Sequence, residues 1–350
     1  MKKLRLLALL LAAVFMLSAC ASGNGGGSPS PTGSSTQEPL RIGYIAPIVL
    51  PYFDLVKQGC ERFAEETGAE IEYHFGAAES GSQQDEDAAM TAMAAKGIRN
   101  FLVFPDDDVA ANASFQELKD IGCNIVNYGG DTAKPTPVSF YVGQNKDEIC
   151  RARAQYVVDA LGGKGNIILA YQDSTDPNVA IARKAYNETF EAAGMKVIQE
   201  LTDLNGAEMA QAKFNDAIAA NYGNIDGILV YGLQVSIGLT YSLAEYYADN
   251  PDADHIFVFT LNDTQEALAA LRAGNTNVTT YEPSEVAGYI ACWLLARMRD
   301  GWTPKEGAYF LYVPEIYITM DNIDDYTSDA ERISAELMAR AEVELLEKPN

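Results

Sequence analysis

Residues 41–75 read RIGYIAPIVLPYFDLVKQGCERFAEETGAEIEYHF and contain three successive patterns. A short apolar run over 41–46 predicts a strand, and an amphipathic run over 52–67 predicts a helix that ends at Gly68. A second short run over 70–75 predicts another strand. A strand, a helix and a strand in this order are typical of the βαβ unit of a parallel sheet.

The same alternation continues along the rest of the chain. Further strands are predicted over 100–104, 124–128, 166–171, 196–200, 227–231, 255–260, 276–281 and 309–320. Further helices are predicted over 85–96, 109–121, 147–161, 178–193, 207–220, 236–247, 264–273, 284–300 and 328–346, the last packing on the outside. Two successive runs of this kind predict an α/β protein with two Rossmann-like lobes, each built on a parallel sheet.

The N-terminal residues have the order of a secretory signal peptide. Lys2, Lys3 and Arg5 precede an apolar run over 6–16, which is too short for a bilayer span, and Leu17-Ser-Ala-Cys20 follows. This tetrapeptide resembles the lipobox of bacterial lipoproteins, which implies that residues 1–19 are removed and that Cys20 is lipidated. The alternative is an ordinary secreted protein in which Cys20 is incidental.

Residues 20–39 continue from this cysteine with glycine, serine, proline and threonine. Such a segment has little apolar surface to bury, so it is expected to be a flexible spacer. A lipid anchor and a spacer together place the folded body at the outer face of the cell membrane or in the periplasm.

The charge of the chain excludes some partners. Lysine and arginine number 25 against 49 aspartates and glutamates, and removal of residues 1–19 changes the formal charge from −24 to −27 because it takes away three basic residues. A body this acidic is repelled by nucleic acid and by anionic lipid surfaces. We therefore expect no nucleic-acid partner.

Histidine and cysteine are sparse, which leaves little material for metal binding or catalysis. The histidines are His74 and His255, and no C-x-x-C pair or nucleophile motif occurs. We expect no metal, no cofactor and no enzymatic activity. The remaining cysteines fit either disulfides or buried free thiols; they are Cys60, Cys123, Cys150 and Cys292.

An ordered set of short motifs resembles the type I periplasmic solute-binding proteins of the ribose and galactose class. The resemblance spans about residues 40–326, and no single motif in it is sharp. The motifs are Ile42-Gly-Tyr-Ile, Pro51-Tyr-Phe, Gly59, 64–68, 98–105, Gly143-Gln-Asn, Leu161-Gly-Gly-Lys-Gly, Ala273-Gly and 318–326.

The resemblance implies two lobes joined by three crossovers, near Gly143, 281–283 and 310–313. It divides the body into an N-terminal lobe of 40–143 plus 283–310, a C-terminal lobe of 144–282 plus 311–326, and a C-terminal helix within 327–350. It also implies a monomer that closes on a small solute by a hinge motion and delivers the solute to an ABC permease.

Ligands of open parallel sheets lie beyond the carboxyl ends of the strands. The loops predicted there are rich in tyrosine, aspartate and asparagine, which suit a sugar because they offer flat apolar faces and planar hydrogen-bonding groups. Some of these polar residues are equally expected as helix N-caps. The candidate ligand-binding residues are Tyr52, Phe53, Asp106, Tyr128, Asp131, Asp176, Asn178, Arg183, Tyr231, Gln234, Asn262 and Tyr281.

Most hydrogen-bonding residues of the ribose-type pattern are replaced here. An asparagine, an Asp-Arg pair, an arginine, a second asparagine, an aspartate and a glutamine correspond to Leu50, Gly129-Gly130, Tyr186, Gly232, Asn262 and Tyr281. The resemblance therefore implies the scaffold but not a charged grip on a pentose. We expect a flatter, less polar or larger ligand held mainly by the tyrosines.

The function predicted is capture of a carbohydrate for an ABC importer. A nucleoside or another small metabolite is the alternative ligand. Presentation of the ligand to a membrane sensor kinase is the alternative role.

Overall fold

The structure is a computed structural model that describes residues 38–77 and 81–349. Contacts divide the chain into residues 1–38 and a folded body of residues 39–350. The predicted signal peptide, Cys20 and all but the end of the predicted spacer lie outside the described residues.

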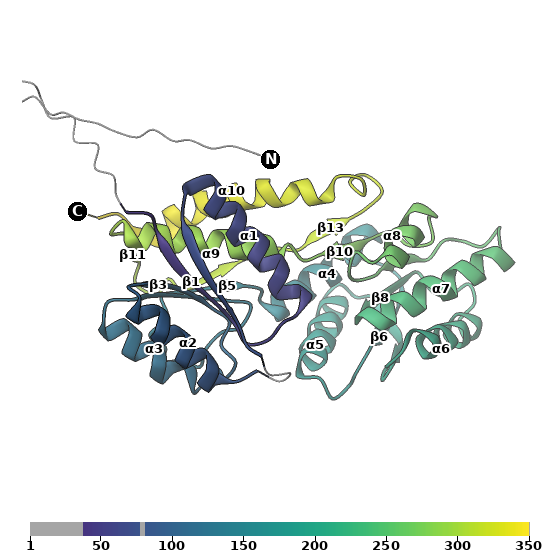
Figure 1. The fold of residues 1–350 in the computed structure, drawn as a ribbon. Helices are drawn as coiled ribbons and strands as arrows, with labels where there is room; N and C mark the ends of the chain where they lie inside the picture. The colour runs from purple at the N-terminus through teal and green to yellow at the C-terminus, as the bar shows by residue number, and fades with distance from the viewer. Residues whose placement is uncertain (1–37, 78–80, 350) are drawn as a thin grey trace, which may run out of the picture. The chain divides into compact units, whose positions relative to one another are not determined.

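The first sheet is parallel throughout and has the order β12-β5-β4-β3-β1-β2. Helices α2 and α3 cover one face of it, and α1 and α9 cover the other (Figure 1). The strands are β1 Arg41–Ala46, β2 Glu70–Phe75, β3 Asn100–Val103, β4 Asn124–Tyr128, β5 Phe140–Gly143 and β12 Phe310–Tyr312; the helices are α1 Pro51–Thr67, α2 Gln83–Ala95, α3 Ala111–Asp120 and α9 Ser284–Arg299.

The second sheet is also parallel, with the order β7-β6-β8-β9, and its core is separate from that of the first sheet. Its strands are β6 Asn166–Tyr171, β7 Lys196–Leu201, β8 Gly227–Tyr231 and β9 Phe257–Phe259; its helices are α4 Lys146–Ala160, α5 Pro177–Ala192, α6 Ala207–Ala220, α7 Leu233–Asp249 and α8 Gln265–Arg272. The predicted α/β fold with two parallel sheets is confirmed.

Local sequence signals explain where helices α1, α4 and α5 begin. Helix α1 starts with Pro51, whose fixed φ suits a first helical position, and it ends at Gly68 with φ of 76°. The side chains of Asn145 and Asp176 cap α4 and α5 by accepting hydrogen bonds from backbone N–H groups of the first turn. No helix in the described part of the chain is long and apolar enough to cross a membrane.

The strand predicted over 309–320 is two strands. Residues Phe310–Tyr312 form β12 beside β5, whereas Ile316–Ile318 form β13, which pairs antiparallel with β10 (Thr279–Tyr281). Pro314 lies between them and has no N–H for a ladder, so the continuous strand prediction was wrong. The two predicted strands over 255–260 and 276–281 are shorter than expected, at three residues each.

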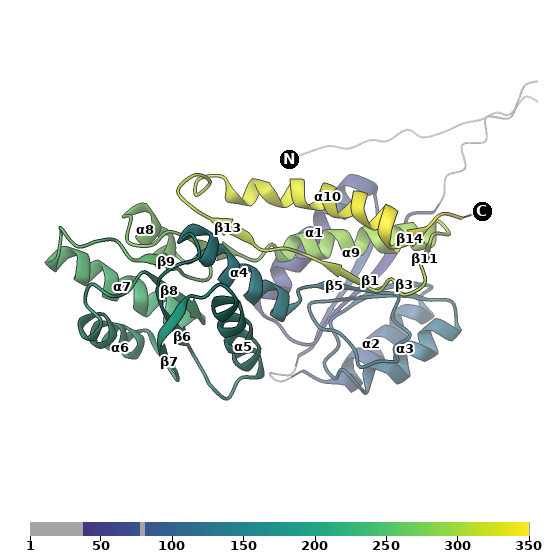
Figure 2. The same cartoon turned by 180° about the vertical axis from the view of Figure 1, so that it is seen from behind.

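The C-terminal residues pack on the outside of the first lobe, and their last strand belongs to a separate two-stranded sheet. Helix α10, Asp329–Glu344, lies along α9 with buried Ile333 and Leu337, and β14, Leu346–Glu347, pairs with β11, Thr303–Pro304 (Figure 2). The guanidinium of Arg297 on α9 also pairs with Glu342. The last helix therefore covers the outside of the first lobe.

Two alternatives were open for the cysteines after Cys20. The structure has all four as buried free thiols. Burial, the main cause, together with the neighbouring thiol of Cys292, raises the pKa of Cys60 between α1 and α9. Both cysteines belong to the core that joins these two helices.

One carboxyl group is fully buried in the first lobe. Glu86 on α2 is 0 % exposed; its Oε2 accepts a hydrogen bond from the Asp106 N–H at 3.1 Å, and its Oε1 has no partner among the described residues. Burial raises the pKa of Glu86 to about 8, although the hydrogen bond from Asp106 opposes the shift.

Glu86→Gln is expected to remove a pH dependence of stability. The folded protein holds a proton on Glu86 that the unfolded chain releases above its ordinary pKa near 4.5, so the wild-type free energy of unfolding falls as pH rises from about 5 to 8. The slope from this group is at most about 1.4 kcal/mol per pH unit. Urea unfolding at pH 5 and pH 8 measures it. If the free energy of unfolding of the Glu86→Gln variant falls between pH 5 and pH 8 by as much as that of the wild-type protein, this role of Glu86 is contradicted.

Candidate functional site

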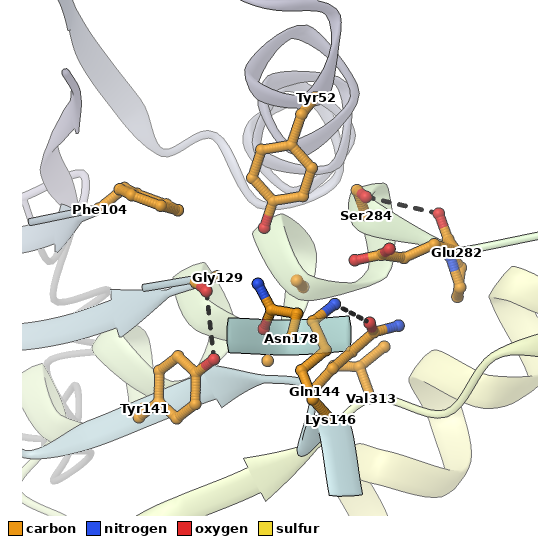
Figure 3. Close-up of a pocket in the computed structure, with 13 residues that line it drawn as sticks. Tyr52, Phe104, Gly129, Tyr141, Gln144, Lys146, Asn178, Glu282, Ser284 and Val313 are labelled. Carbon is orange, nitrogen blue, oxygen red and sulfur yellow. Dashed lines mark hydrogen bonds between the residues drawn. The ribbon is translucent and has the colours of Figure 1, made fainter. Parts of the chain in front are cut away.

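A cavity of about 440 Å³ lies at the carboxyl ends of the first sheet's strands, beside the segments that connect the two sheets. It is lined by Tyr52, Phe104, Gly129, Tyr141, Gly143, Gln144, Lys146, Asn178, Glu282, Pro283, Ser284, Ala287 and Val313. Figure 3 shows the polar ends of Tyr52, Asn178, Lys146 and Glu282 pointing toward a common centre. A cavity of this size with a few convergent polar groups is typical of a small-molecule site.

The aromatic wall is built around Tyr52, in the first turn of α1. Its ring packs edge-on against Phe53 and Phe104, with centroids 5.2 and 6.4 Å apart. Its hydroxyl lies against Gly129, where a Cβ atom would come within 2.1 Å of the oxygen. Gly129 also has φ of 65°, a conformation that favours glycine. Because Gly129 has no side chain, the Tyr52 hydroxyl can lie against it.

A second tyrosine lies beside the first. The hydroxyl of Tyr141 donates a hydrogen bond to the Gly129 carbonyl at 3.2 Å. Burial is the main cause that raises the pKa of Tyr141, to about 12. Burial also raises the pKa of Tyr52, so both phenols remain neutral near pH 7 and present hydrogen-bonding groups with apolar ring faces.

Charged and amide groups form the other side of the cavity. The Lys146 ammonium donates to Gln144 Oε1 at 3.3 Å, and the Nε2 of Gln144 is buried with no partner among the described residues. Asn178 enters from the first turn of α5, where its Nδ2 donates to Asp176 Oδ1 at 3.1 Å. The set offers several donors and acceptors to a polar ligand.

Glu282 supplies the carboxylate of the cavity. It lies between β10 and α9, and its side chain is exposed to the open cavity. Although the side chain faces the open cavity, the protein atoms packed around the carboxylate partly desolvate it and raise its pKa, and nearby Lys146 opposes the shift.

The predicted site residues fall into several places. Tyr52 and Asn178 line the cavity, and Asp176 caps the helix that carries Asn178. Phe53 and Tyr128 lie in the core instead, at 3 % and 0 % exposed, because the Tyr128 hydroxyl donates to the Ile45 carbonyl at 3.1 Å and Phe53 packs on the Tyr128 ring.

Three further predicted residues, in the first lobe and at its connection to the second, do not line the cavity and form hydrogen bonds with other protein groups. The Tyr281 hydroxyl donates to Glu285 at 2.7 Å, and the Asp131 carboxylate accepts a hydrogen bond from the Tyr309 hydroxyl. Asp106 is exposed and donates its N–H to Glu86.

The remaining predicted residues belong to the second lobe and also lie outside the lining. Arg183 pairs with Glu200, and the guanidinium of Arg153 lies over the Tyr231 ring at 5.8 Å. The Gln234 N–H donates to Gln172 Oε1 at 3.1 Å, and the Asn262 N–H donates to Thr280 at 3.2 Å.

Several lining residues were not among the candidates. They are Phe104, Tyr141, Gln144, Lys146, Glu282 and Ser284, and most lie at the first and second connections between the lobes. The resemblance already predicted where those connections lie. Charged residues next to the connections could therefore have been selected as candidates from the sequence. Across residues 38–77 and 81–349, no three acidic, histidine or cysteine side chains come together as metal ligands would.

Comparison with known families gives a match over most of the body. Residues 45–302 match the family described as periplasmic binding protein domain. A search of curated proteins found no match.

Solved structures share the fold at low identity. A sugar ABC transporter from Actinomyces odontolyticus is 15% identical with a TM-score of 0.69, over 82% of this chain and 97% of that chain. A periplasmic ribose ABC transporter from Conexibacter woesei is 19% identical with a TM-score of 0.66, over 86% and 99%. A sugar-binding protein from Bacillus halodurans is 17% identical with a TM-score of 0.66, over 82% and 99%.

Gly129→Ala is expected to destabilise the protein through Tyr52. The new methyl group meets the Tyr52 hydroxyl and also strains a positive φ, so we expect a loss of about 2 to 4 kcal/mol in the free energy of unfolding. Gly122→Ala is the matched control, since Gly122 has φ of 83° and open space around it, and should cost about 1 to 2 kcal/mol.

Adding Tyr52→Phe to each variant isolates the contact. Removal of the hydroxyl should restore at least about 1 kcal/mol to Gly129→Ala and nothing to Gly122→Ala. Equal losses for the two alanine variants would show that Tyr52 does not depend on Gly129.

Proposed function

The chain belongs to the periplasmic binding protein family, and we propose that it captures a small carbohydrate outside the cytoplasm and delivers it to an ABC importer. The observation that carries this proposal is the mixed character of the cavity. Tyr52, Phe104 and Tyr141 offer flat apolar surfaces beside the amides of Gln144 and Asn178 and the charges of Lys146 and Glu282. A sugar needs both, because its C–H faces are apolar and its hydroxyls donate and accept hydrogen bonds.

Capture by hinge closure fits the placement of the lining. Most lining residues come from the first lobe and the connections, whereas Lys146 at the start of α4 and Asn178 on α5 come from the second lobe. A ligand that contacts Tyr52 and Asn178 together favours the closed form over the open form, since only closure brings both sides to it. The permease then recognises the closed form of the protein. Capture and delivery of the ligand require no covalent step.

The N-terminal residues support a membrane-anchored location for the protein, which we propose to be a monomer. A short apolar segment, a small residue and Cys20 precede a spacer rich in glycine and serine. We propose that Cys20 is lipidated and holds the body at the outer face of the cell membrane.

The ligand class is tested by a thermal-shift screen of neutral sugars, polyols and nucleosides. A ligand present at about 100 times its Kd stabilises the native state by about 2.7 kcal/mol, which raises the melting temperature by several degrees. We expect at least one neutral sugar to do so. A response to nucleosides with none to sugars would contradict the carbohydrate proposal.

Tyr52→Ala is expected to weaken binding of that sugar by about tenfold or more, because the ring contributes on the order of 1–3 kcal/mol of contact. Phe115→Leu on α3 is the control, because Phe115 is 0 % exposed in the core on the other face of the first sheet. It should lower the melting temperature and leave the Kd within about threefold. Calorimetric titration and unfolding of both variants separate the two roles. Unchanged affinity in Tyr52→Ala would remove this cavity from the proposal.

Cys20→Ser is expected to release the protein from membranes. Without the thiol no lipid is attached, and the body carries a large negative charge that gives it no attraction to anionic lipid. Fractionation of cells followed by immunoblotting checks this. Unchanged membrane association would overturn the anchor.

A further inference from the structure

Lys146 and Glu282 are the two charged residues among those that line the cavity. Both side chains are exposed to it, yet neither forms an ion pair within the described residues. Figure 3 shows both side chains among the lining residues, with their polar ends directed toward the cavity. Opposite charges that share a cavity without pairing leave a place for a ligand group between them.

The backbone on both sides is held firmly. Glu282 precedes Pro283, and its carbonyl accepts hydrogen bonds from the N–H of Ser284 at 2.8 Å and from its hydroxyl at 3.4 Å. Lys146 opens α4 directly after the capping residue Asn145. The backbone that carries each of the two charges is therefore hydrogen-bonded at a connection between the lobes.

The other charges that influence Glu282 are already paired with each other. Arg153 on α4 and Glu315 after β12 form a buried ion pair with contacts of 2.5 and 2.8 Å, and their side chains are 8% and 4% exposed. Both influence the pKa of Glu282, in opposite directions. Among the lining residues, Lys146 is positive and Glu282 is negative, so the lining has no net charge.

Hydrogen-bonding chemistry limits what fits between the two groups. A carboxylate only accepts and an ammonium only donates, whereas a hydroxyl does both. Two neighbouring hydroxyls satisfy the pair when one donates to Glu282 and the other accepts from Lys146. Hydrogen bonds to charged groups are stronger than those between neutral groups, so this contact contributes to selectivity as well as to affinity.

We propose that Lys146 and Glu282 form a clamp for two adjacent hydroxyls, which selects uncharged sugars over their amino and carboxylate analogues. The proposal rests on the proposed function, because it specifies which carbohydrates the same cavity accepts. An amino sugar meets Glu282 favourably but is repelled by Lys146, and a uronate meets the reverse. Each charged analogue therefore satisfies one of the two groups and is repelled by the other, whereas a neutral sugar satisfies both.

The experiment measures Kd by calorimetry at pH 7 for a matched set of probes. These are D-glucose and D-galactose, with D-glucosamine and D-galactosamine as cationic analogues and D-glucuronate and D-galacturonate as anionic analogues. We expect the wild-type protein to bind a neutral sugar at least about tenfold more tightly than its charged analogues.

Single substitutions should shift the preference in opposite directions. Glu282→Gln is expected to weaken binding of the neutral sugar by about tenfold to a hundredfold. It should also shift the ratio of the two affinities, uronate to neutral sugar, in favour of the uronate by about tenfold or more. Lys146→Gln moves the ratio toward the amino sugar by a similar factor. The double variant has a neutral cavity again and should regain the preference for the neutral sugar.

Surface variants with the same charge change serve as controls. Glu191→Gln on α5 and Lys213→Gln on α6 alter exposed side chains away from the lining. They should leave every ratio within about twofold, which separates local effects from the effect of total charge. Melting temperatures of all variants confirm that they are folded.

The outcomes distinguish a failure of the Lys146–Glu282 clamp from a failure of carbohydrate capture. If neutral sugars bind but both single variants keep the wild-type ratios, the clamp is wrong and carbohydrate capture stands. If the wild-type protein prefers a charged analogue, the clamp is also wrong. If no carbohydrate binds, the proposed function fails and the clamp fails with it.

Discussion

The close crossing of α1 and α9 is the contact on which the cavity depends. A Cβ atom on Gly59 would lie 1.8 Å from the carbonyl oxygen of Glu285, and one on Gly288 would lie 2.0 Å from that of Val56. Each helix thus meets the backbone of the other through a glycine, which allows a closer approach than any larger residue would. The two helices lie far apart in sequence, and this crossing joins them over the first sheet.

The crossing also determines where the functional groups lie. Tyr52 is in the first turn of α1 and Ser284 opens α9, so two helix N-termini meet at the cavity. The residues before them arrive from the strands of the first sheet and from the second lobe. Glu282 is therefore placed by the packing of α9, and Lys146 by the cap of α4. A binding site made from connections is well suited to link ligand contact with a change in lobe position.

The sequence allowed the alternating strands and helices to be predicted, because buried parallel strands are apolar runs and caps such as Asp176 mark helix starts. It did not reveal which side chains face the cavity. Tyr52 and Phe53 are adjacent on a helix and therefore point in directions about 100° apart, so one lines the cavity and the other enters the core. Lys146 was passed over because its role depends on Glu282, which lies far away in the chain.

The central claim is that a carbohydrate binds in the cavity where α1, α4, α5 and α9 begin. A crystal structure of the protein grown with the neutral sugar that binds most tightly tests it most directly. The account predicts the sugar ring against Tyr52, with hydroxyls within hydrogen-bonding distance of Lys146 and Glu282 and with Asn178 closing from the second lobe. A sugar bound elsewhere, such as in the groove between α7 and α8, with this cavity empty would contradict the account.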